Sequence, residues 1–130
     1  MTARLVPAVG DPDLSGLVGL DRIRAAAETL RGVTVRTPLL PVGPPERRHY
    51  LKAESLQPIG AFKLRGAYVA VASLEPAQRA RGVISYSSGN HAQGVARAAR
   101  LLGAPAVVVM PSDAPALKAR RVAADGAEIV

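Results

Sequence analysis

Residues 82–130 alternate between short apolar segments and amphipathic segments, and this alternation constrains the fold more than any other feature of the sequence. The β-branched run at 106–110 is typical of a parallel strand buried on both faces. The order strand, helix, strand, helix, strand favours a parallel sheet with right-handed crossovers. We therefore predict an α/β fold, a parallel sheet with helices on both faces. The predicted elements are strand 82–86, helix 91–102, strand 106–110, helix 113–124 and strand 127–130.

The first 80 residues carry a less regular pattern. Residues 1–20 are rich in Pro, Gly and Asp, and we predict an irregular lead-in there. Asp21 and Asp113 each stand where a helix is expected to begin, so both are candidate N-cap residues. The predicted elements of this part are helix 20–30, extended segment 37–41, turn 43–45, strand 50–54, loop 55–60 and helix 61–74.

The composition narrows the possible function classes. The net charge of +7 would suit a nucleic-acid partner, but the basic residues are spread along the chain. Only three Tyr and one Phe are present, too few for base stacking, so we expect no nucleic-acid partner. The chain has no cysteine, and we expect no metal site. No apolar run approaches the ~20 residues of a membrane span, and no signal core is present, so we expect a cytoplasmic protein without a membrane partner.

Lysine is rare in this chain, with three lysines among 17 Lys and Arg residues. A lysine kept among so many arginines is a candidate for chemistry that arginine cannot perform, because only lysine readily becomes a free amine and forms a Schiff base. Lys63 follows a glycine-containing loop and stands near the start of the predicted helix 61–74. From its spacing alone, Lys63 is also explained as an exposed lysine in the first turn of a helix, with no chemical role.

The segment Ser87-Ser88-Gly89-Asn90-His91 lies between a predicted strand and a predicted helix. Open α/β sheets bind ligands at the carboxyl ends of their strands. Backbone N–H groups at such a turn attract anions, and small side chains let a carboxylate or phosphate approach. On local grounds these residues are equally well explained as turn and cap residues. His91 alone would more often be a cap or core histidine than a catalyst.

Two segments together carry a family resemblance. Residues 57–67 read Gln-Pro-Ile-Gly-Ala-Phe-Lys-Leu-Arg-Gly-Ala, and residues 87–94 read Ser-Ser-Gly-Asn-His-Ala-Gln-Gly. In this order and spacing they resemble the signatures of the fold-type II pyridoxal-phosphate enzymes, in particular threonine dehydratase and serine racemase. The resemblance extends over about residues 34–130.

The resemblance implies a two-domain architecture like that of the tryptophan synthase β subunit, with pyridoxal 5'-phosphate as cofactor and a homo-oligomer when complete. Residues 1–80 would be the N-terminal part of the large cofactor domain, and 81–130 an incomplete small α/β domain. Lys63 would form the Schiff base, Phe62 would pack near the pyridine ring, and Asn90 would bond the ring hydroxyl. The substrate α-carboxylate would be bound, mostly by backbone N–H groups, by Ser87, Ser88, Gly89, Asn90 and His91, with Gln93 in support.

The same resemblance implies an amino-acid substrate and a dehydratase reaction, in which L-threonine or L-serine gives a 2-oxo acid and ammonia. An amino-acid racemase, a hydroxyaspartate-type lyase and a non-catalytic remnant stay open as alternatives. Ile59, Ala61 and Val69 depart from the residues of many relatives.

None of the twelve glycines are adjacent, so the family's glycine-rich phosphate cradle is absent from these residues. The chain also stops on a predicted strand. We therefore expect a fragment that, alone, does not turn over substrate.

Overall fold

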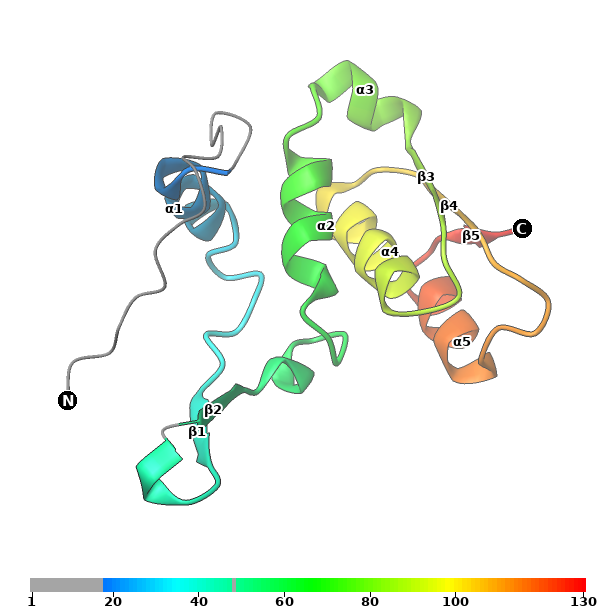
Figure 1. The fold of residues 1–130 in the computed structure, drawn as a ribbon. Helices are drawn as coiled ribbons and strands as arrows, with labels where there is room; N and C mark the ends of the chain where they lie inside the picture. The colour runs from blue at the N-terminus through cyan, green and yellow to red at the C-terminus, as the bar shows by residue number, and fades with distance from the viewer. Residues whose placement is uncertain (1–17, 48) are drawn as a thin grey trace, which may run out of the picture.

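The computed structural model describes residues 18–47 and 49–130, so most of the lead-in predicted for 1–20 lies outside the described residues (Figure 1). A hairpin and two short 3-10 turns precede a helical and parallel-strand region. No helix of the described ranges has the length and apolar character to cross a membrane. The elements are α1 (Leu20–Thr29), β1 (Leu39–Val42), η1 (Pro45–Arg47), β2 (His49–Lys52), η2 (Glu54–Leu56), α2 (Lys63–Ala72), α3 (Pro76–Arg81), β3 (Val83–Tyr86), α4 (Asn90–Leu102), β4 (Ala106–Val109), α5 (Ala116–Ala124) and β5 (Glu128–Ile129).

The C-terminal strands form the predicted parallel sheet. Their order is β3-β4-β5, and both pairings are parallel, with Val83 opposite Ala106 and Val107 opposite Glu128. Strands β1 and β2 form a separate antiparallel pair. The prediction of an α/β fold with a parallel sheet is confirmed.

Both crossover helices pack on the same face of this sheet (Figure 1). Ala96 of α4 and Val122 of α5 are buried in one cluster with Val108 of β4. The strand order runs in one direction, so crossovers of one hand place both helices on one side. The opposite face is open among the described residues, and Ile84 and Tyr86 there are 76% and 85% exposed. Helices on both faces would require a reversal of the strand order, which these three strands do not contain.

Helix α4 is the centre of the packing, because it lies between α2 and the sheet. Ala98 and Val95 of α4 are buried against Ala67 and Val71 of α2. On its other side, α4 presents alanines to β4. Small side chains let the two helices and the sheet approach closely, which is why an alanine-rich helix suits this position.

The helix starts differ from the predicted caps. Gly19 is the N-cap of α1 and Pro115 that of α5, so the assignments of Asp21 and Asp113 as caps are wrong. Helix α3 was not predicted, although Glu75 and Gln78 form a capping box around its first turn. That spacing, with Pro76 at the first helical position, is a signal that the sequence does contain.

A polar network ties the segment before β1 to the start of α2. The guanidinium of Arg65 donates to both carboxylate oxygens of Glu54, at 2.8 and 2.9 Å, and to the carbonyl of Val35 at 2.9 Å. Gln57 exchanges two hydrogen bonds with the backbone of Val35, at 2.8 and 3.0 Å. The Nζ of Lys52 donates to Thr37 Oγ1 at 2.7 Å. The segments 35–37 and 52–57 and the start of α2 at Arg65 are therefore joined by one network around the Glu54 carboxylate.

The lowered pKa of the Glu54 carboxylate leads to a prediction of how the stability of the fold changes with pH. Its hydrogen bonds from Arg65 lower its pKa from 4.5 to about 2, although partial burial opposes the shift. A carboxylate with a lowered folded pKa contributes stability that is complete above the unfolded pKa and is lost as the pH falls toward the folded one. We expect the stability difference between the wild type and Glu54→Gln to be largest above pH 5 and to shrink between pH 5 and pH 2. Urea unfolding at a series of pH values measures it.

Glu128→Gln is the matched control, because Glu128 is exposed and forms no ion pair within the described ranges. A Glu54→Gln effect that is constant with pH, or that is equalled by Glu128→Gln, would contradict the assignment.

Candidate active site

The loop between β3 and α4 forms a turn at the carboxyl edge of the sheet. The N–H of Ser87 donates to the carbonyl of Val109 at 3.1 Å, which fixes the start of the loop to β4. The N–H of Gly89 donates to Ser87 Oγ at 3.2 Å. Helix α4 begins at Asn90, and its N-cap, Gly89, supplies no side-chain acceptor. The first-turn N–H groups of α4 lack intrahelical partners, so this end of the helix is suited to an anion.

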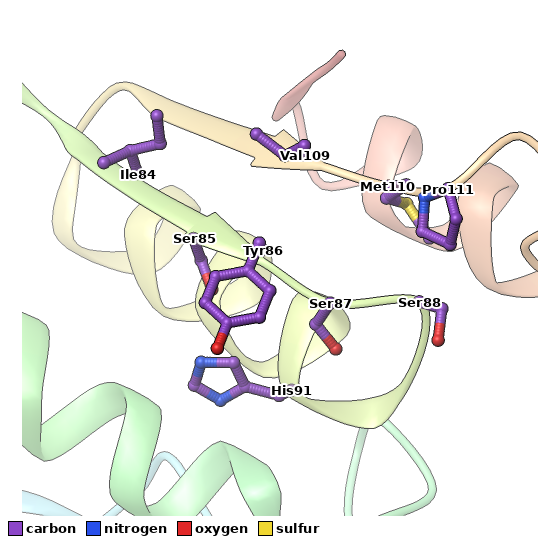
Figure 2. Close-up of a pocket in the computed structure, with 9 residues that line it drawn as sticks. All are labelled: Ile84, Ser85, Tyr86, Ser87, Ser88, His91, Val109, Met110 and Pro111. Carbon is purple, nitrogen blue, oxygen red and sulfur yellow. The ribbon is translucent and has the colours of Figure 1, made fainter.

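A pocket of about 880 Å³ opens beside this loop (Figure 2). The side chains of Tyr86 and His91 project to the same side of the sheet in Figure 2. Ser87 and Ser88 lie at one end of the pocket, and β3 and β4 form its apolar floor. Its lining residues are Ile84, Ser85, Tyr86, Ser87, Ser88, His91, Val109, Met110 and Pro111. The pocket therefore joins a polar turn to the open apolar face of the sheet.

Lys63 is the first residue of α2, and Phe62 is its N-cap. The Nζ of Lys63 lies 5.2 Å from the centroid of the Phe62 ring, a cation–π distance. Among the described residues no carboxylate lies within ion-pair distance of this amine. The neighbouring cation, Arg65, is instead paired with Glu54. The amine of Lys63 is exposed and available for covalent chemistry.

The two motifs meet where α4 crosses the start of α2. A methyl group on Gly94 would lie 3.1 Å from the carbonyl oxygen of Lys63 and 3.3 Å from the Cβ of Ala67. The glycine thus lets the backbone of α4 approach the first turn of α2. Through this contact the start of α2, which carries Lys63, packs against the N-terminal part of α4, which follows the loop 87–91.

Gln93 occupies the first turns of α4 and is almost completely buried, at 2% exposure. Its Nε2 donates to Asn90 Oδ1 at 3.5 Å, and its Oε1 accepts no hydrogen bond from the residues that the structure describes. The bond links Gln93 to the first residue of α4, and its support of the loop 87–91 stays a prediction. Asn90 itself is exposed, so its amide remains accessible at the helix start.

The predicted site residues do not all line one pocket. Lys63 and Phe62 do not line the pocket beside Ser87 and His91. The described residues contain no cluster of three or more metal-ligating side chains. One contact was not predicted: a methyl group on Gly89 would lie 3.3 Å from the Nζ of Lys118. The scarcity of lysine was the signal that could have drawn attention to Lys118.

The residues fit one end of a pyridoxal-phosphate molecule. An exposed amine beside an aromatic ring suits the cofactor's aldehyde and pyridine ring, and the Asn90 amide is a donor for the ring oxygen. The described residues offer no glycine-rich cradle for the phosphate end.

Comparison with known proteins identifies the family. Residues 30–130 match the family described as pyridoxal-phosphate dependent enzyme. The chain belongs to this family. It is 47% identical over 109 residues to an L-threo-3-hydroxyaspartate ammonia-lyase from a Pseudomonas species. That alignment covers 81% of this chain and 34% of the Pseudomonas protein. Over 118 residues the chain is 42% identical to the L-threonine ammonia-lyase of Thermotoga maritima, covering 88% of this chain and 29% of that protein.

The fold comparison agrees with the sequence comparison. The structure of maize serine racemase is similar with a TM-score of 0.79 and 38% identity, over 85% of this chain and 35% of that one. The predicted family, the cofactor and the α/β fold class with its parallel sheet are confirmed, while the two crossover helices of the described residues lie on one face of that sheet. The chain spans about a third of the length of the curated relatives it matches.

The contact at Gly94 predicts a specific loss of stability. Gly94→Ala places a methyl group against the Lys63 carbonyl, and we expect unfolding to become easier by about 1–3 kcal/mol. Gly66→Ala is the matched control, because Gly66 lies within α2 and a methyl group there meets nothing within 4 Å. Both changes carry the same helix-propensity gain of about 1 kcal/mol, so the difference between them isolates the contact.

Urea unfolding midpoints of the two variants measure this difference. If Gly94→Ala is as stable as Gly66→Ala, the close approach of α4 to α2 is not a constraint on this fold.

Proposed function

We propose that this chain is part of a pyridoxal-phosphate dependent ammonia-lyase that converts L-threonine or L-serine into a 2-oxo acid and ammonia. The observation that carries the proposal is the meeting of two helix starts. Lys63, which has no carboxylate partner among the described residues, begins α2, and the start of α4, without a side-chain cap, belongs to the helix that crosses α2 at Gly94. An amine at the start of one helix and an anion site at the start of a helix packed against it suit a substrate that carries both an amino group and a carboxylate.

Each residue has a proposed part in this reaction. Lys63 would hold the cofactor through Nζ, with Phe62 beside the ring and the Asn90 amide donating to the ring oxygen. The loop formed by Ser87, Ser88, Gly89, Asn90 and His91 would bind the substrate α-carboxylate through backbone N–H groups. When bound, the cofactor supplies an electron sink for the α-carbon of the amino acid. The Nζ of Lys63, once free, would accept the proton from that carbon.

Hydroxyaspartate is the second candidate substrate. The Pseudomonas relative at 47% identity is an L-threo-3-hydroxyaspartate ammonia-lyase, and the Thermotoga threonine ammonia-lyase is 42% identical. Both substrates have a β-hydroxyl and differ in the group that follows it. The likeness to maize serine racemase supports racemisation as a further activity of the same residues. Ammonia release from each amino acid and chiral analysis of recovered serine separate these possibilities.

The division of the chain also belongs to this proposal. Residues 1–80 would contribute to the large cofactor domain and 81–130 to the small domain, with the boundary at the end of α3. Helix α2 packs across that boundary onto α4. A cytoplasmic homo-oligomer is the proposed state of the complete protein.

The assignment of Lys63 is tested with the protein that carries this chain. After treatment with pyridoxal phosphate and borohydride, we expect one cofactor adduct on the peptide that contains Lys63. The chain has three lysines, Lys52, Lys63 and Lys118, so peptide mass mapping resolves them. Lys63→Ala and Lys63→Arg should both lose the adduct and ammonia release, because neither side chain supplies a free amine.

Lys52→Arg is the matched control, because it changes a lysine that contacts Thr37 and leaves the helix start untouched. An adduct that persists in Lys63→Ala, or one found at Lys52, would show that Lys63 is not the cofactor residue.

A further inference from the structure

Lys118 brings a second cation to the loop that the proposed function assigns to the substrate carboxylate. It is the third residue of α5, and its Nζ lies 3.3 Å from the position of a methyl group on Gly89. Since a C–C bond is about 1.5 Å long, this ammonium lies within roughly 5 Å of the Gly89 backbone. The side chain of Lys118 therefore reaches from α5 across to the start of α4.

The position of this lysine is electrostatically unfavourable unless an anion is present. A cation in the first turn of a helix faces the positive end of the helix dipole, and Lys118 occupies the first turn of α5. Its ammonium also approaches the positive end of α4. In the part of the chain that the structure describes, no carboxylate lies within 4.0 Å of Lys118, and Asp113 in the preceding loop is not paired with it.

Gly89 makes the approach of the ammonium possible. Gly89 is the N-cap of α4 and has no side chain, so Nζ comes close to the backbone from which this helix starts. Backbone N–H groups and a point charge can bind one carboxylate together, because each oxygen of a carboxylate accepts more than one hydrogen bond. Lysine suits such a site, since its ammonium is compact and mobile at the end of a flexible stem.

We propose that Lys118 is a substrate-binding residue whose ammonium, together with the loop 87–91, holds the α-carboxylate of the amino acid. This inference rests on the proposed function, because it assigns a partner to the carboxylate that the proposal places at this loop. The ligand class is an α-amino acid carboxylate, bound through the charge of Lys118 from one side and the helix start from the other.

Steady-state kinetics of the protein that carries this chain test the proposal. We expect Lys118→Met to raise KM for L-threonine and for L-serine by about tenfold or more, because a charge-assisted hydrogen bond is lost, and to change kcat by less than about threefold. Lys118→Arg should recover part of the loss. Arg120→Met is the matched control, because it removes one positive charge from the exposed side of the same helix. Equal KM changes in Lys118→Met and Arg120→Met would overturn the proposal.

A double-mutant cycle tests whether the ammonium acts across the gap at Gly89. A methyl group in Gly89→Ala would displace the ammonium, so Gly89→Ala should raise KM in the wild type and have little effect in Lys118→Met. Fully additive effects would show that the two residues act separately and would overturn the proposal. A KM increase confined to 3-hydroxyaspartate would overturn it too, since it would assign the ammonium to the second carboxylate.

A binding measurement separates this proposal from the proposed function. Acetylation of Lys118 by an amine-reactive reagent, read by peptide mass mapping, should slow severalfold in sodium acetate relative to sodium chloride of equal ionic strength, while Lys52 is unaffected. This readout uses the unaltered protein, so it stays decisive if a variant does not fold. Protection without turnover would contradict the proposed function and support the carboxylate site, whereas turnover without protection would contradict the role of Lys118.

Discussion

The close approach of α4 to the first turn of α2 is the contact on which the rest of the structure depends. At Gly94 the two backbones come so close that a methyl group would lie 3.1 Å from the Lys63 carbonyl oxygen, and one of them would have to shift to admit it. Since α4 also covers β3 and β4, this one contact joins the segment that carries Lys63 to the sheet that presents the loop 87–91. The distance between an amine and an anion site is thus set by backbone packing, which is stiffer than any arrangement of flexible side chains.

The second constraint is electrostatic, and it acts on the same helix. Arg65 is two residues from Lys63, yet its guanidinium is turned toward Glu54 and the carbonyl of Val35. This pairing has two consequences. It fixes the start of α2 against the chain before β1. It also occupies the Glu54 carboxylate, so that Lys63, in the same helix turn, has no carboxylate partner among the described residues. The network therefore orders the start of α2 without engaging the side chain of Lys63.

The sequence predicted most elements because the period of the apolar residues was regular. The predicted helix 91–102 and strand 106–110 agree with α4 and β4 to within one residue at each end. Helix caps were predicted less well, since Asp21 and Asp113 have the right chemistry but the chain turns at Gly19 and Pro115. Periodicity also carries no information on which face a crossover helix covers. Of the site, both motifs could be recognised from residue types, whereas the contacts at Gly94 and Lys118 depend on how separate helices cross, which local patterns do not specify.

The strand order of the parallel sheet has a consequence for the folding process. Because β3, β4 and β5 are neighbours in the sheet in the order in which they occur along the chain, each strand pairs with the one made just before it. Each closure then spans only one helix and its turns, and short loops lose less chain entropy on closing than long ones. Each pairing still needs the intervening helix to be enclosed, since Val83 pairs with Ala106 and Val107 with Glu128, so these parallel closures form more slowly than a hairpin would. The loop 87–91 lies within the first of these closures, and its hydrogen bond from the Ser87 N–H to the Val109 carbonyl can form only when β4 is in place beside β3.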